Sequence, residues 1–124
     1  MVSRAERLGA EKSAGCLLVL FIPSVDRDEQ PIEHDIWVTA ALKVVGTLFS
    51  GGTAFPQGKG VWRDDRRGGT LVFDEPSIIQ CYTDESLIDT HLEAIRDFLV
   101  QLGRSTNQGA VGFVIDREYY EIRF

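Results

Sequence analysis

The feature that most restricts the fold is a run of apolar residues without a polar member. Residues 16–22 read Cys-Leu-Leu-Val-Leu-Phe-Ile, and Pro23 ends the run. A strand whose sheet has one face in water alternates apolar and polar residues, so this run predicts a strand covered on both faces. A second run, residues 111–115, has no polar member either, and Ile78 and Ile79 are adjacent in a third.

Two segments have the apolar spacing of amphipathic helices. The first is expected to begin near Pro31, because proline is favoured in the first turn, and to end at Gly51. The second is expected to begin after a cap at Thr83 or Asp84 and to end near Gly103. The apolar positions are Ile32, Ile36, Ala40, Val44 and Leu48 in the first, and Ile88, Leu92, Ile95, Leu99 and Leu102 in the second.

The segment between the helices predicts a β-hairpin. Residues 58–64 and 70–82 are the expected strands, joined by a polar, glycine-containing turn. Pro76 cannot donate to a strand ladder, so we expect it at a bulge or an edge of the second strand. Near the end of the chain, residues 110–115 predict a core strand. Residues 119–124 then form either a short additional strand, which we favour, or the end of one bent strand.

The expected order of elements is β-α-β-β-α-β. This order predicts an α+β domain, a ferredoxin-like two-layer sandwich with an antiparallel sheet, two helices on one face and a possible extra C-terminal strand. A chain of 124 residues fits one domain of ordinary size. We therefore expect a flexible polar arm at residues 1–14 and a single α/β domain at residues 15–124.

The ferredoxin-like arrangement leaves one sheet face without helices, yet the strands are apolar on both sides. Several exposed apolar side chains in one patch favour association. We therefore predict a homodimer that packs through this open sheet face. The alternative is that the N-terminal arm or the C-terminal strand folds over it.

Several short motifs occur in a fixed order along the chain. They are Gly51-Gly52-Thr53 with Phe55-Pro56, Gly60-x-Trp62-Arg63, Glu75-x-Ser77, Gln108-x-x-Val111 and the helical Trp37. In these motifs the chain resembles a family of small bacterial proteins that are grouped as a domain of unknown function. The resemblance implies the βαββαβ pattern but no activity. Members of that family are often exported, whereas this chain shows no export signal.

Charge and composition limit the classes of partner and the cellular location that we expect for the chain. The chain has 13 Lys+Arg and 19 Asp+Glu, which gives a formal net charge of −6. This acidic balance argues against binding to the phosphate backbone of nucleic acid. Cys16 and Cys81 are too few for a disulfide scaffold. No segment is long enough to span a membrane, and we expect a cytoplasmic protein.

Candidate ligand-binding residues gather on the predicted hairpin. A cross-strand Arg63–Glu75 pair beside Trp62 would orient a small polar or anionic ligand, since a guanidinium offers planar, bidentate donors. The alternative is a structural salt bridge next to a packing tryptophan. The full set of ligand-binding candidates is Trp62, Arg63, Asp64, Glu75, Ser77 and Tyr82.

The sequence gives less support to a metal site or an acid–base catalytic site than to the ligand-binding residues on the hairpin. A divalent cation would need the acidic pairs Asp64-Asp65 and Asp74-Glu75 on the same side of the hairpin, and we expect neither a metal nor a cofactor. We expect His34 to be exposed on the first helix. It has no nucleophile at a recognisable spacing.

We therefore interpret the chain as a non-catalytic dimeric module that binds a partner protein or a small ligand. The alternative is a small dimeric ferredoxin-like enzyme that acts on a small polar or anionic substrate through Arg63 and Glu75. A third hypothesis, a metal-dependent protein that processes nucleic acid, conflicts with the acidic charge.

Overall fold

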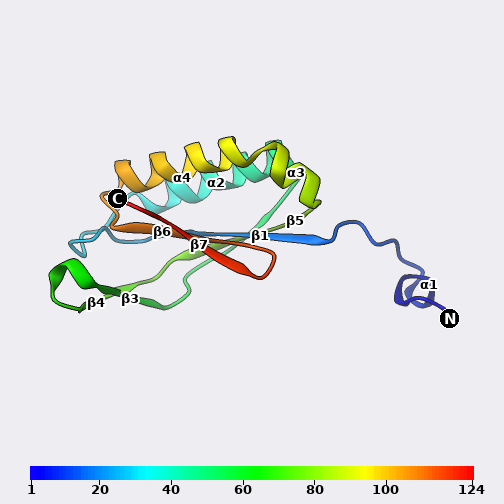
Figure 1. The fold of residues 1–124 in the computed structure, drawn as a ribbon, viewed down its shortest axis with the longest axis horizontal. Coiled ribbons are helices and arrows are strands. Elements are labelled where there is room, and N and C mark those ends of the chain that lie inside the picture. Colours follow the sequence, from blue (N-terminus) through cyan, green and yellow to red (C-terminus); the bar gives the residue numbers. More distant parts are fainter.

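The computed structural model describes residues 1–124 as a helical layer, a sheet and a separate hairpin on the other side of the sheet (Figure 1). The helices are α1 (Arg4–Leu8), α2 (His34–Phe49), α3 (Glu85–Thr90) and α4 (Leu92–Ser105), with the short 3-10 helix η1 (Asp65–Arg67). The strands are β1 (Cys16–Ile22), β2 (Thr53–Phe55), β3 (Gly60–Asp64), β4 (Thr70–Asp74), β5 (Ser77–Thr83), β6 (Ala110–Ile115) and β7 (Glu118–Arg123).

The main sheet has five antiparallel strands in the order β2-β5-β1-β6-β7. Both long helices, α2 and α4, cover the same face (Figure 1). The α+β class with helices on one face is therefore confirmed. The exact ferredoxin-like pattern is not, because β7 extends the sheet and the chain inserts a separate hairpin between β2 and β5.

The hairpin prediction was wrong in its second strand. Residues 70–82 do not form one strand, because Pro76 divides them into β4, which pairs with β3, and β5, which pairs with β1 and β2. Proline has no N–H to donate, so a ladder cannot continue through it. The Pro76 carbonyl instead accepts a hydrogen bond of 2.8 Å from the N–H of Gly58. The sheet strand that sequence reading missed is β2, which has only three residues.

The core lies between the sheet and the two long helices. Alternate residues of β1, beginning at Cys16 and ending at Ile22, point to the helices and are buried. They meet Val45 from α2 and Leu99 and Leu102 from α4. Each fully buried Leu or Ile contributes about 1.5–3 kcal/mol to the stability of the fold. This layer therefore fixes the sheet that carries the site.

The ends of the helices differ from the predicted ends. α2 begins at His34 rather than near Pro31, because Pro31 forms a bridge with Val25. It ends with Ser50 in the left-handed conformation, at φ 74°, rather than with a glycine. The second predicted helix is divided into α3 and α4 at His91.

The sheet face opposite the helices carries the other side chains of β1. Leu17, Val19 and Phe21 are half-buried there. The β3–β4 hairpin lies over one end of this face, whereas α1 lies away from the sheet and β7 extends the sheet edge (Figure 1). The alternative, that the N-terminal arm or the C-terminal strand folds over this face, was therefore wrong.

Cys16 and Cys81 are buried as free thiols in the core. Burial raises the pKa of both thiols above the ordinary value, which disfavours the reactive thiolate. No helix combines the length and the apolar character that a bilayer crossing needs.

Candidate functional site

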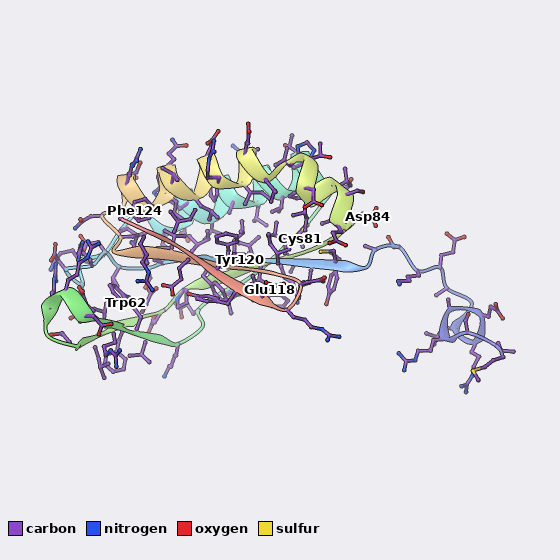
Figure 2. All side chains as sticks on the ribbon, in the orientation of Figure 1. Trp62, Cys81, Asp84, Glu118, Tyr120 and Phe124 are labelled. Carbon is purple, nitrogen blue, oxygen red and sulfur yellow. The ribbon has the colours of Figure 1, made fainter.

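The β3–β4 hairpin reaches the sheet through Trp62. Trp62 is opposite Val72 in the hairpin ladder, and Val72 is buried at 2% exposure. The indole lies against Gly109, where a Cβ atom would be 3.1 Å from the Trp62 ring. Figure 2 labels Trp62 on the hairpin. A side chain at position 109 would therefore crowd the Trp62 ring and require it to shift.

A cleft of about 220 Å³ lies between the hairpin and the open sheet face. Its walls include the aromatic rings of Phe21, Trp62 and Tyr119 and the carboxylates of Asp74 and Glu121. We call it the aromatic–acid cleft. Concave, largely apolar sites with a few polar groups are typical of small-molecule binding.

Tyr119 and Glu121 enter this cleft from β7. They are opposite Val114 and Gly112 in the β6–β7 ladder, on the face away from the helices. The Tyr119 ring is 6.5 Å from the Phe21 ring, centroid to centroid. Burial and the nearby Glu121 carboxylate raise the pKa of the Tyr119 phenol, which therefore keeps its proton at neutral pH.

The other carboxylate of the cleft is held by the loop after β1. Asp74 accepts hydrogen bonds from the Ser24 N–H at 2.8 Å and from the Ser24 hydroxyl at 2.6 Å. Both bonds end on Oδ1, so Oδ2 remains available as an acceptor. Gln108, also in the cleft wall, donates its side-chain N–H groups to Val25 and Thr106.

A second cleft, of about 380 Å³, adjoins the first and shares Trp62, Ala110, Tyr119 and Glu121 with it. We call it the arginine cleft, because its wall includes the guanidinium groups of Arg27, Arg63, Arg66 and Arg123. Small-molecule sites measure about 300–1,000 Å³, so the two connected clefts are large enough for one extended ligand.

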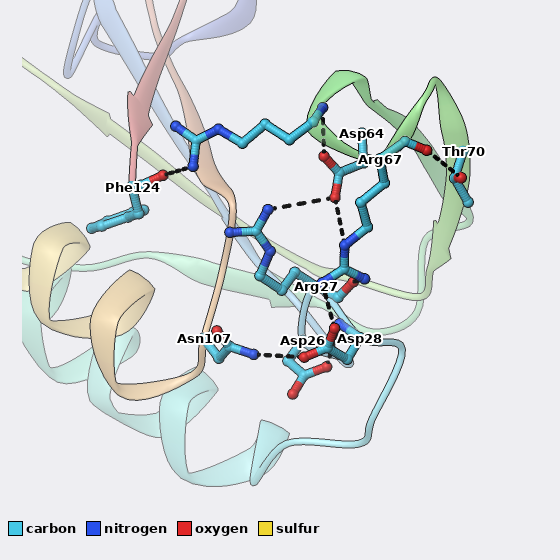
Figure 3. Close-up of polar contacts among 9 residues, drawn as sticks. Asp26, Arg27, Asp28, Asp64, Arg67, Thr70, Asn107 and Phe124 are labelled. Carbon is cyan, nitrogen blue, oxygen red and sulfur yellow. Dashed lines mark hydrogen bonds and ion pairs between the residues drawn. The ribbon is translucent and has the colours of Figure 1, made fainter.

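Asp64 is the buried charge of the arginine cleft, with 3% of its side chain exposed. Its Oδ1 accepts the N–H of Arg66 at 3.1 Å. Its Oδ2 lies 3.6 Å from a terminal nitrogen of Arg27 and 3.4 Å from Nε of Arg67. Figure 3 shows these contacts and the further pair between Arg67 and Asp28, with Asn107 donating to the same Asp28 carboxylate at 3.1 Å.

Of the six predicted ligand-binding residues, the structure brings Trp62, Arg63 and Asp64 to the arginine cleft. The predicted Arg63–Glu75 pair was wrong. Arg63 is opposite Leu71 and binds its near neighbour Asp65 at 2.6 Å. Glu75 follows the end of β4, where its N–H donates to the Ser24 hydroxyl.

Ser77 and Tyr82 lie elsewhere on β5. Ser77 is buried and its hydroxyl is 2.7 Å from Nε2 of His34, while Nδ1 of His34 is 2.7 Å from the Pro23 carbonyl. The expectation of a solvent-exposed His34 was therefore wrong. Tyr82 is exposed opposite Leu17, at the end of β5 remote from Ser77.

The acidic pairs of the hairpin lie at its two ends. Asp64 pairs with Thr70 at the tip, and Asp74 pairs with Gly60 at the base. A single cation therefore cannot be bound by both. The structure contains no cluster of three or more His, Cys, Asp or Glu side chains arranged for a metal.

Sequence reading missed Tyr119, Glu121 and Gln108 as site residues. For Tyr119 and Glu121 the sequence did contain a usable pattern. In a tight hairpin formed by residues 110–115 and 119–124, alternate residues share a face, which places Tyr119 and Glu121 beside Gly112. Gln108 follows α4 and has no comparable pattern.

No protein-family model and no curated protein match the chain. The fold is similar to that of a phage SAM lyase solved in complex with S-methyl-5′-thioadenosine. The TM-score is 0.69 at 16% sequence identity, over 91% of this chain and 92% of that one. The apo state of a phage SAM lyase matches with a TM-score of 0.61 at 15% identity, over 90% of each chain.

These neighbours correct the functional interpretation. Both are enzymes, so the hypothesis of a non-catalytic binding module was wrong, and the alternative of a small enzyme is favoured. The bound S-methyl-5′-thioadenosine belongs to the neighbour.

Proposed function

We propose that this chain is a small enzyme that cleaves S-adenosylmethionine (SAM), or a closely related sulfonium nucleoside, in the aromatic–acid cleft. One observation carries the proposal. The cleft combines the rings of Trp62 and Tyr119 with the carboxylates of Asp74 and Glu121, in a chain whose fold is similar to a SAM lyase.

This combination suits the chemistry of the substrate. An adenine base stacks on flat aromatic rings, and a sulfonium cation is attracted to the faces of Trp and Tyr rings. The carboxylates of Asp74 and Glu121 add negative charge beside the rings. A positively charged nucleoside therefore has both an apolar and an electrostatic reason to bind here.

The reaction itself needs little from the protein. The bond that breaks joins the sulfonium sulfur to the γ-carbon of the amino-acid chain, and its electron pair stays on sulfur as the neutral thioether S-methyl-5′-thioadenosine. In the step that we propose, the substrate's own carboxylate oxygen attacks the γ-carbon and closes a lactone. No water is consumed and no proton moves, so the site contributes by folding the substrate into the reactive geometry and excluding water.

The direct test of binding uses S-methyl-5′-thioadenosine in isothermal titration calorimetry. We expect the wild-type chain to bind it and Tyr119→Ala to weaken binding about tenfold, because stacking on one aromatic ring contributes about 1–3 kcal/mol. Tyr120→Ala is the matched control, since Tyr120 is an exposed tyrosine on the same strand as Tyr119 but outside both clefts. No binding by the wild-type chain, or equal loss in both variants, would contradict the proposal.

We also propose that a second copy of the chain covers the part of the open sheet face that the hairpin leaves exposed. Support comes from the half-buried Leu17 and Val19 and the exposed Tyr82 on that face. Light scattering on the purified chain is expected to give a dimer, and Val19→Glu is expected to give a monomer. A monomeric wild-type chain at micromolar concentration would refute this assembly.

The ligand-binding residues Trp62, Arg63 and Asp64 stay part of the proposal, as lining residues of the arginine cleft. The cytoplasmic location expected from the sequence stays a prediction.

A further inference from the structure

The arginine cleft contains polar groups that the fold does not satisfy. Nε of Arg27 and Oδ2 of Asp64 are both buried and have no hydrogen-bond partner. Buried polar atoms in native proteins are nearly always hydrogen-bonded. Asp64 Oδ2 has the ion pairs with Arg27 and Arg67, so the Arg27 Nε donor is the atom that calls for an explanation. Both residues line the arginine cleft.

Arg27 is the largely buried guanidinium of this cleft with capacity left for a ligand. Arg123, which also lacks a hydrogen bond, is 77% exposed and lies 4.0 Å from Glu121. Arg63 binds Asp65 at 2.6 Å. Arg66 binds the main-chain oxygen of Phe124, which is labelled in Figure 3, at 2.6 Å. Arg27, in contrast, shares the single carboxylate of Asp64 with Arg67, at a distance beyond a hydrogen bond. Its side chain is 20% exposed and lines the arginine cleft.

Arg27 also lies beside the aromatic–acid cleft. A Cβ atom at Gly109 would be 3.8 Å from the guanidinium carbon of Arg27 and 3.1 Å from the Trp62 ring. The Arg27 guanidinium and the Trp62 indole therefore lie against the same glycine, where the two clefts meet.

The charge of the arginine cleft is opposite to that of the whole chain. The formal net charge of the protein is −6, yet this cleft has four guanidinium groups in its wall against the carboxylates of Asp64, Asp65 and Glu121. A local excess of positive charge in an acidic protein attracts an anionic group. Glu121 lies in both clefts and provides an acceptor for a cationic group next to that anion.

We propose that the arginine cleft binds the amino-acid end of the sulfonium substrate, with its α-carboxylate on Arg27 and its α-ammonium on Glu121. This inference rests on the proposed function. The adenosine part then lies in the aromatic–acid cleft, and the two connected clefts hold the two ends of one molecule. S-Methyl-5′-thioadenosine lacks the amino-acid end, so it leaves the arginine cleft empty and binds more weakly than the substrate.

The test compares three ligands on the wild-type chain by calorimetry. They are S-methyl-5′-thioadenosine, S-adenosylhomocysteine, which keeps the amino-acid end without the reactive sulfonium, and decarboxylated S-adenosylhomocysteine, which keeps the amine only. We expect S-adenosylhomocysteine to bind at least about tenfold more tightly than the other two, since its carboxylate gains charge-assisted hydrogen bonds that the other two ligands lack. Equal affinity with and without the carboxylate would overturn the inference, whatever the variants do.

A second experiment repeats the ligand comparison with the Arg27→Gln variant. This variant is expected to lose the preference for S-adenosylhomocysteine and to bind S-methyl-5′-thioadenosine as the wild type does. Arg96→Gln is the matched control, because Arg96 is an exposed arginine on α4 that pairs only with Asp97. Retention of the preference in Arg27→Gln would also overturn the inference.

The two proposals fail in different ways. If S-methyl-5′-thioadenosine binds but the carboxylate adds nothing, only the amino-acid subsite is wrong. If neither thioether nucleoside binds the wild-type chain, the proposed function is wrong, and the subsite is rejected with it. If Arg27→Gln does not fold, the three-ligand comparison on the wild-type chain decides the matter.

Discussion

The phenol of Tyr119 occupies the space that a side chain at Gly112 would fill. A Cβ atom added at Gly112 would collide with the hydroxyl oxygen and the ring of Tyr119. Gly112 is on β6 and Tyr119 on β7, so the absence of one side chain lets the other lie flat over the sheet. The position of the ring that lines both clefts therefore depends on a glycine in the neighbouring strand.

Gly112→Ala is expected to displace Tyr119 and to destabilise the fold by about 1–3 kcal/mol, the usual cost of overpacking. Urea denaturation measures the change. The double variant Gly112→Ala/Tyr119→Ala is expected to recover most of the loss, since the collision is removed.

Gly46→Ala is the control for that substitution. Gly46 is inside α2 with no atom near its missing Cβ, so alanine there is expected to stabilise by about 0.5–1 kcal/mol. If Gly112→Ala is as stable as the wild type, the packing of Tyr119 on Gly112 is not as described.

Asp64→Asn is expected to loosen the attachment of the hairpin tip. Removing one partner of a buried ion pair costs about 3–5 kcal/mol, but Arg27 and Arg67 are 20% and 40% exposed, so solvent reduces the loss to about 2 kcal/mol. Thermal unfolding monitored by circular dichroism measures it.

Asp65→Asn serves as the matched change one residue along. Asp65 and its partner Arg63 are 70% and 68% exposed, so this variant is expected to differ from the wild type by less than about 0.5 kcal/mol. Equal effects of the two substitutions would mean that the burial of Asp64 has no energetic consequence.

The layers of the fold were predictable from sequence because they follow from periodicity. The apolar stripes of α2 and α4 and the runs of β1 and β6 are dictated by burial, and burial repeats with the geometry of each element. β2 was not predictable, since its three residues form a strand only by pairing with β5. The break between β4 and β5 at Pro76 was predictable, because proline cannot continue a strand ladder. The pairing of β5 with β1 and β2 was not predictable from that proline.

The site was harder to predict because it joins distant segments. Trp62 was identified as a candidate, but its neighbours in the cleft come from β1, β6 and β7. The erroneous Arg63–Glu75 pair came from a wrong hairpin register, because the ladder places Arg63 opposite Leu71 and ends at the Gly60–Asp74 pair. Contacts such as Arg27 with Asp64 depend on how the hairpin lies on the sheet, which no local pattern encodes.

The titration of Tyr119 provides a pH-dependent prediction. Burial and Glu121 raise its pKa above the ordinary value of 10.0, so the folded chain holds this proton more tightly than the unfolded chain. Stability is therefore unaffected below about pH 10 and falls as the pH rises from there through the higher folded pKa. Tyrosinate absorbance of the wild type minus that of Tyr119→Phe isolates this group, and a difference titrating below 10.0 would contradict the prediction.

The most direct measurement of the central claim is the breakdown of SAM by the purified wild-type chain in oxygen-18-labelled water, followed by chromatography and mass spectrometry. A protein-free sample corrects for spontaneous decay, and Tyr119→Ala shows whether the cleft is responsible. The account predicts S-methyl-5′-thioadenosine forming far above the protein-free rate, together with an unlabelled lactone at early times. Formation at the protein-free rate, or a rate unchanged in Tyr119→Ala, would contradict it.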